Sequence, residues 1–153
     1  MRPTLALVSA AALITLLAGC GGNSSGKDKD AGQGFSAAAD TSTCVQDATQ
    51  VSAYPGGFPT DFPLPDQTVV YHVQDLGADG IVATGVTPLS LKQVLAALNG
   101  PAQDAGFKVT NGETEDHDAE ANWSGNGYVG RWAIKDSANC PGEVVVQLLA
   151  KKG

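Results

Sequence analysis

The N-terminal segment constrains this chain more than any other feature of its sequence, because it indicates that the folded part begins well inside the chain. The run from Leu5 to Leu17 is apolar except for Ser9 and Thr15, and Arg2 is the only charged residue before it. A helix that spans a bilayer needs roughly 20 apolar residues, and this run is shorter. A basic residue followed by a short apolar run is typical of an export signal. We therefore expect a signal peptide over residues 1–19.

The apolar run ends in Leu17-Ala18-Gly19-Cys20. This tetrapeptide resembles the lipobox of bacterial lipoproteins, in which a branched residue and two small residues precede a cysteine. The resemblance implies thioether attachment of a diacylglyceryl group to Cys20, cleavage of the signal peptide before it, and N-acylation, as by palmitate. Each buried CH₂ contributes about 0.8 kcal/mol, so two or three acyl chains hold a protein firmly on a bilayer. The resemblance thus implies a lipid anchor on the extracytoplasmic face of the cell membrane.

The segment that follows, residues 20–43, combines the lipidated cysteine with what we expect to be a flexible linker. It holds one aromatic residue and shows no apolar periodicity. Such a composition buries too little apolar area to offset the entropy lost on ordering. We therefore place the single folded domain at residues 44–153.

Two cysteines remain if Cys20 carries lipid, as the resemblance implies. Cys44 and Cys140 would then pair in a compartment that permits disulfides. The bond would close a loop of 140 − 44 = 96 residues, which the chain-entropy model values at about 4 to 5 kcal/mol. We expect this disulfide rather than a catalytic thiol.

The domain starts with a proline-rich stretch, in which Pro55, Pro59 and Pro63 recur at every fourth position. Proline fixes its own φ and biases the residue before it toward extended geometry, so we expect an extended arm. Phe58 and Phe62 directly precede two of these prolines, and their size favours burial against the domain. A proline-rich recognition motif is the alternative.

A hairpin and a helix are predicted next. The segments 68–74 and 81–86 alternate in strand fashion, and the Asp79-Gly80 pair between them is a turn signal. Residues 90–93, SLKQ, fit a capping box. Apolar residues then recur at helical spacing from Leu91 to Ala105, and Pro101 should kink or split the helix after Leu98.

The remainder predicts further strands. Phe107 to Thr110 begins one, Asn126-Gly127 marks a two-residue hairpin, and Glu143 to Ala150 is the most hydrophobic strand. We expect an α+β domain of two layers, in which an antiparallel sheet of about five strands, in ββαβββ order, carries one helix on a face. This order, with its proline-rich arm, is similar to that of many small actinobacterial envelope lipoproteins of unassigned role, a resemblance that implies no activity.

The most distinctive polar cluster runs from residue 113 to residue 120. Its carboxylate oxygens suit a hard cation such as Ca²⁺, but it lacks the spacing of a calcium-binding loop, and no second histidine completes a zinc site. We expect a solvated, mobile acidic hairpin without a metal, and keep a divalent-cation binder as an alternative. We also expect the surrounding carboxylates to raise the pKa of its histidine. The candidate ligands are Glu113, Glu115, Asp116, His117 and Asp118.

Enzymatic motifs are weak. The two histidines, His72 and His117, lack a nucleophile elbow or a paired-carboxylate spacing. Residues 125–130, GNGYVG, match G-x-G-x-x-G, but a strand-like segment follows where a nucleotide-binding helix would start, so they indicate a hairpin. We expect no enzyme and no cofactor. An enzyme would need a cleft that gathers His72 or His117 with carboxylates.

An aromatic surface for sugars, lipids or a partner protein is a further possibility, built from Trp123, Tyr128, Arg131 and Trp132. Strand alternation places Trp132 with Ile134 in the core, so only part of this group would face water.

The net charge of the chain also bears on its partners. A net charge of −7 gives no basic surface for phosphates, which excludes nucleic acid as a partner. We expect a lipid-anchored envelope protein whose domain binds, without catalysis, another envelope protein or component. The alternative is a carrier of a small apolar ligand or lipid in a pocket between helix and sheet.

Overall fold

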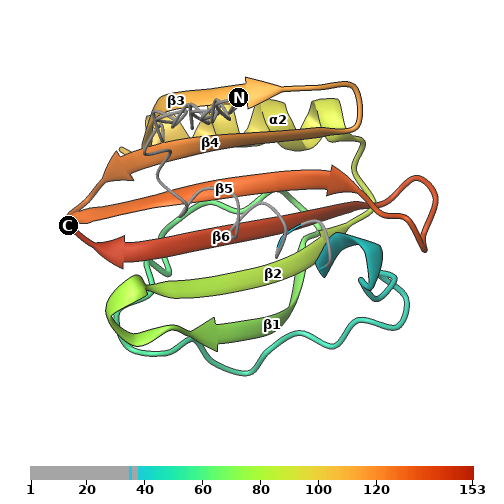
Figure 1. The fold of residues 1–153 in the computed structure, drawn as a ribbon, viewed down its shortest axis with the longest axis horizontal. Coiled ribbons are helices and arrows are strands. Elements are labelled where there is room, and N and C mark those ends of the chain that lie inside the picture. Colours follow the sequence, from blue (N-terminus) through green and yellow to red (C-terminus); the bar gives the residue numbers. More distant parts are fainter. Residues whose placement is uncertain (1–34, 36–37) are drawn as a thin grey trace, which may run out of the picture.

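The computed structural model describes Phe35 and residues 38–153 (Figure 1). The expected signal peptide, Cys20 and the first part of the expected linker lie outside these residues. One antiparallel sheet of six strands dominates the fold, in the spatial order β1-β2-β6-β5-β4-β3. The strands are β1 (Val69–Asp75), β2 (Ile81–Thr87), β3 (Lys108–Thr114), β4 (Asp118–Gly125), β5 (Tyr128–Asp136) and β6 (Val144–Lys152).

The helical layer is a split helix. It consists of α2 (Leu91–Asn99) and α3 (Pro101–Asp104), which meet at Gly100. The capping box starts α2 as predicted, with the Ser90 backbone N–H donating to Gln93 Oε1 at 3.0 Å. The break follows from Pro101, which lacks an N–H and fits at the first position of a new helix. A short 3₁₀ turn, η1 (Gly77–Asp79), joins β1 to β2.

The α+β class with one antiparallel sheet is confirmed, but the predicted five strands and ββαβββ order are one strand short. The acidic stretch belongs to two paired strands, with Glu113 opposite Glu120 and Thr114 opposite Ala119. In β4, small or aromatic residues alternate with polar ones, so one side packs while the acids stay in water. The expected acidic hairpin is therefore the turn between β3 and β4 together with the ends of both strands.

The Asn126-Gly127 hairpin is confirmed. Both residues have positive φ, at 50° and 79°, which a two-residue turn between twisted strands requires. The G-x-G-x-x-G match is therefore the turn from β4 to β5, and β5 continues directly after it.

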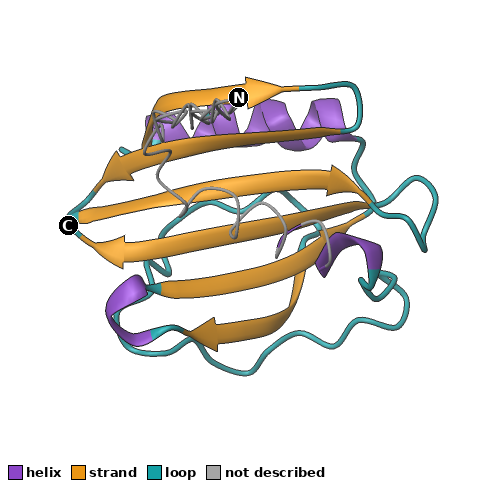
Figure 2. Ribbon diagram, in the orientation of Figure 1, coloured by secondary structure: helices purple, strands orange, loops and turns teal. Residues whose placement is uncertain are grey.

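The core lies between the sheet and α2, which is behind β3 and β4 in the view of Figure 2. Val94 and Leu98 of α2 are fully buried. The proline-rich arm packs against the same core, since Phe62 lies 4.9 Å from Phe107 and 5.1 Å from Trp123 between ring centroids. Phe58 is buried as well, so both arm phenylalanines pack as expected.

Cys44 and Cys140 form the predicted disulfide, with their Cα atoms 5.6 Å apart. It ties the start of the domain to the loop between β5 and β6. The backbone N–H of Val45 also donates to Glu143 Oε2 at 2.9 Å. None of the helices in the described part of the chain has both the length and the hydrophobicity needed to cross a bilayer.

Candidate functional site

The side of the sheet that faces away from α2 is the candidate site, and we call it the open face. Alternate residues of a strand point to opposite sides, so each strand contributes to both the core and the open face. On β4, for example, Ala119, Ala121 and Trp123 lie in the core. Glu120 and Asn122, between them, lie on the open face.

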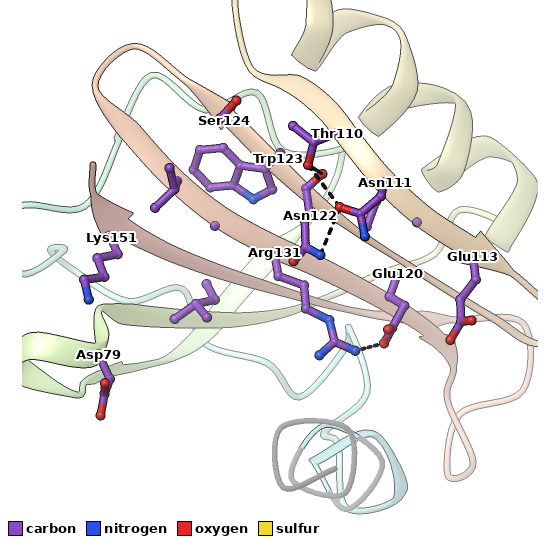
Figure 3. Close-up of a pocket in the computed structure, with 15 residues that line it drawn as sticks. Asp79, Thr110, Asn111, Glu113, Glu120, Asn122, Trp123, Ser124, Arg131 and Lys151 are labelled. Carbon is purple, nitrogen blue, oxygen red and sulfur yellow. Dashed lines mark hydrogen bonds and ion pairs between the residues drawn. The ribbon is translucent and has the colours of Figure 1, made fainter. Parts of the chain in front are cut away.

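A polar groove of about 890 Å³ crosses the open face over β3, β4 and β5 (Figure 3). Its side chains bond to one another across strands. Asn122 Nδ2 donates to Asn111 Oδ1 at 3.2 Å, and Thr110 Oγ1 donates to the carbonyl oxygen of Asn122 at 3.3 Å. Arg131 and Glu120 form an ion pair, with 21% and 34% of their side-chain surfaces exposed. The groove thus presents amide, guanidinium and carboxylate groups at fixed positions, which suits hydrogen-bonded recognition.

An apolar trough of about 400 Å³ lies beside the groove, over β1, β2, β6 and β5. Val82, Ala133 and Leu149 provide apolar surface in its lining. Gln147 Nε2 donates to Thr84 Oγ1 at 3.3 Å, so these two polar side chains satisfy each other. The trough and the groove share Arg131, Leu149 and Asp79, and therefore form one continuous depression.

The end of the expected linker packs on the open face. We call this segment the strap, and it consists of Phe35 and residues 38–42. Phe35 and Ala39 are buried against Ala133 of β5 and Val145 of β6. Phe35 and Ala38 also line the trough. The expected domain boundary after residue 43 therefore falls within a packed region.

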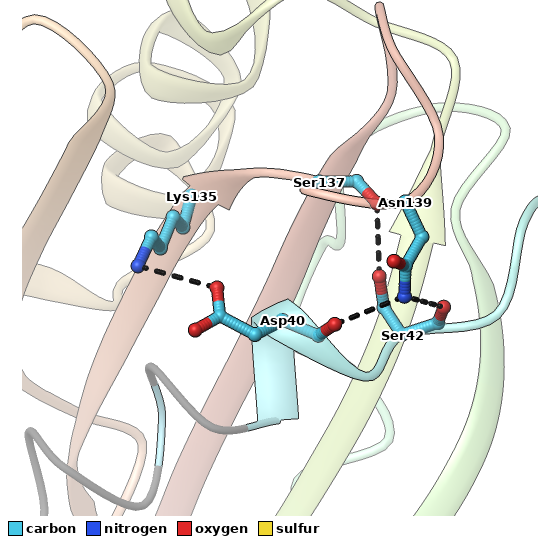
Figure 4. Close-up of polar contacts among 5 residues, drawn as sticks. All are labelled: Asp40, Ser42, Lys135, Ser137 and Asn139. Carbon is cyan, nitrogen blue, oxygen red and sulfur yellow. Dashed lines mark hydrogen bonds and ion pairs between the residues drawn. The ribbon is translucent and has the colours of Figure 1, made fainter.

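Polar contacts hold the strap in place (Figure 4). The hydroxyls of Ser42 and Ser137 are hydrogen-bonded at 2.9 Å in a buried position. Asn139 Nδ2 donates to the carbonyl oxygen of Asp40 at 2.9 Å, and Lys135 Nζ lies 3.7 Å from Asp40 Oδ1. The sequence signal that points to this packing is Phe35, the one aromatic residue of a segment otherwise rich in small and polar residues.

The acidic candidates are spread over β3, β4 and the turn between them. Glu113 lines the groove, whereas Glu115, Asp116 and His117 lie in the turn, and Asp118 begins β4. Within the described residues, they do not form a group of ligand atoms close enough to share a metal ion. The described group that is close enough is Cys44, Cys140 and Glu143, and its two sulfurs are joined in the disulfide.

His117 has an exposed ion-pair partner. Its Nδ1 lies 3.0 Å from Asp136 Oδ2. The hydrogen bond to Asp136 and the charge of that carboxylate raise the pKa of His117 above 6.5, and Asp116 and Asp118 add to the effect. The structure does not bring the two histidines together, since His72 lines the trough from β1 while His117 lies at the β3–β4 turn.

The expected aromatic surface is not formed by its tryptophans. Trp123 and Trp132 are each 2% exposed and belong to the core. Gly130 explains the position of Trp123, because a Cβ at this residue would collide with the indole and with the carbonyl oxygen of Leu149. Tyr128 is half-buried against the core. Arg131 lines the groove of the open face, and Trp123, although 2% exposed, borders the same groove.

Comparisons of the chain with protein-family models, with curated proteins and with solved structures give no match.

Proposed function

We propose that this chain is a lipid-anchored protein of the cell envelope whose domain binds another envelope component through the open face. The proposal rests on the difference between the two sides of the sheet. One side is filled by α2 and the proline-rich arm, while the other bears a groove of about 890 Å³ lined by hydrogen-bonding and charged side chains. Depressions of several hundred Å³ with convergent polar groups are the usual form of binding sites.

The lipobox resemblance at Cys20 supports the membrane part of the proposal. The strap follows Cys20 by 35 − 20 = 15 residues, and it lies on the open face. An extended chain of that length reaches at most about 50 Å. A lipid on Cys20 would therefore hold the domain by the side that carries the groove, within reach of ligands at the membrane surface.

Binding of an apolar ligand is the second candidate, and the trough favours it. The sequence-based form of this idea placed the pocket between helix and sheet. That region is occupied by the buried side chains of Val94, Leu98 and Trp123. The trough on the open face offers an apolar lining instead, so a carrier role would use the same face as the principal proposal.

Site-specific photo-crosslinking tests the binding face. A photoreactive amino acid is placed at Asn122, in the groove, in the full chain produced in its native cells. The matched control is Lys92, an exposed residue of α2 on the opposite layer. We expect discrete crosslinked products from position 122 and few from position 92. Equal crosslinking from both positions would contradict the proposal.

Mass spectrometry tests the anchor. The purified protein should begin at Cys20 and carry the mass of a diacylglyceryl group and an acyl chain. A Cys20→Ala variant should lose both that mass and its sedimentation with membranes. Recovery of unprocessed protein with Met1 and an unmodified thiol at residue 20 would refute lipid anchoring.

A further inference from the structure

We infer that the trough holds the acyl chain of a single-chain amphiphile with a neutral, hydroxyl-bearing head, such as a monoacylglycerol, and that the head lies at Arg131. This inference rests on the proposed function, since it takes the open face as the binding surface, and it names a ligand class for that face.

The shape of the trough favours an extended chain. Its lining residues come from β1, β2, β6 and β5, which are consecutive in the sheet. Neighbouring strands lie 4.7–4.9 Å apart, so three spacings give the trough a length of about 14 Å across the strands. Val82 and Leu149 face each other across β2 and β6, with Ala133 on β5. A narrow apolar path across strands matches a hydrocarbon chain better than a compact ring.

Two apolar side chains from outside the strands, Phe35 and Leu76, complete the lining of the trough. Phe35 of the strap, which is 8% exposed, contributes an apolar wall. Leu76, beside η1, also lines the trough and is 41% exposed. An acyl chain in the trough would cover the exposed side chain of Leu76.

The charged side chains at the rim of the trough favour one kind of head group on the ligand. Arg131 lines both the trough and the groove and is ion-paired with Glu120. Because Glu120 already neutralises the guanidinium, a second carboxylate at this position would meet repulsion from Glu120. A hydroxyl can instead accept from Arg131 and donate to Glu120. Asn111 and Asn122, farther along the groove, offer further donors and acceptors to a polyol. A neutral polyol head therefore fits this rim better than an anionic one.

Labelling in cells tests the inference. A monoacylglycerol with a 12-carbon chain that bears a diazirine is added to cells that produce the full chain, and labelled peptides are identified after irradiation. A free fatty acid with the same chain and diazirine forms the second arm. We expect labelling on peptides of β2 and β6, and stronger labelling by the monoacylglycerol than by the fatty acid.

Two matched variants locate the site. Val82→Glu introduces a charge into the trough and should reduce labelling about tenfold, since an unpaired charge is unfavourable beside an acyl chain. Ala96→Glu introduces the same charge at an exposed residue of α2, on the opposite side of the sheet from the trough, and should reduce labelling by less than about twofold. A cooperative urea unfolding transition verifies that both variants have folded.

Three results would overturn the inference: no labelling of β2 and β6, equal labelling of Val82→Glu and the unaltered chain, or preference for the fatty acid. Crosslinking from Asn122 to another envelope component would still support the proposed function in each case. Equal crosslinking from Asn122 and Lys92, together with the expected labelling of β2 and β6, would count against the groove as a contact surface for another envelope component and would still support the trough as a ligand site.

Discussion

The two faces of the sheet are built from the same strands but have opposite roles. On β6, Val144, Val146 and Leu148 lie in the core and are at most 2% exposed. Between and beyond them, Gln147 and Leu149 line the trough of the open face. The face covered by α2 and the proline-rich arm therefore supplies most of the buried apolar side chains. The other face is thereby free to carry amides, ion pairs and an apolar trough.

The strap is the exception on the open face. It buries Phe35 and Ala39 there, and it continues directly into Cys44. Its contacts reach the β5–β6 loop through Ser137 and Asn139. The open face is therefore partly covered by the chain's own N-terminal segment, at the side where the proposed anchor enters.

Loss of the disulfide should have the largest effect on stability. It tests whether this bond stabilises both faces of the sheet together. Replacing both Cys44 and Cys140 by alanine releases a loop with a sequence separation of 96 residues. The free energy of unfolding should fall by about 4 kcal/mol, because the unfolded chain gains conformational entropy. Urea unfolding measures the change. Reduction of the unaltered protein should have a similar effect, and an unchanged midpoint in both experiments would refute the prediction.

Two adjacent leucines of β6, one in the core and one on the open face, test the difference between the two faces. Leu148 is 1% exposed and lies in the core, so Leu148→Ala should reduce the free energy of unfolding by about 3 kcal/mol through lost burial and a cavity. Leu149→Ala removes the same atoms from the open face and should reduce it by less than about 1 kcal/mol. Thermal or urea unfolding of the two variants gives the answer. Equal losses would show that the open face also contributes core stability.

The smallest expected effect concerns the acidic turn. His117 gains its partner Asp136 on folding, which raises its pKa. Because the pKa of His117 is higher in the folded state, its ion pair with Asp136 stabilises the fold fully at pH values below the pKa of the unfolded chain. That contribution is lost as pH rises through the folded value.

NMR titration of the His117 ring should therefore give a pKa above 6.5, and Asp136→Asn should lower it. Asp116→Asn is the matched control and should lower the pKa by less, because its charge is the lesser cause. A pKa that does not respond to Asp136→Asn would show that the ion pair does not persist in solution.

Much of the fold follows from local patterns. The capping box at Ser90, the break before Pro101 and the Asn126-Gly127 turn are each determined by a few neighbouring residues, so they were predictable. The acidic hairpin and a strand before Asn126 were both expected, but the predicted count of five strands is one too few, because a cluster of like charges does not show how far the flanking strands extend into it. The packing of Phe35 was missed because it depends on Ala133 and Val145, about a hundred residues away in the sequence.

Local patterns along the chain predict most of the elements and, through the two-residue period of the strands, the side chains that share one side of the sheet. If Cys20 carries lipid, as the resemblance implies, the sequence leaves only Cys44 and Cys140 to form a disulfide. The order of the strands in the sheet does not follow from such patterns and is seen only in the folded domain. Placing β6 between β2 and β5 brings Val82, Leu149 and Arg131 onto one surface. Strand order depends on contacts between distant segments, whose free energy comes from burial across the whole sheet rather than from any local preference.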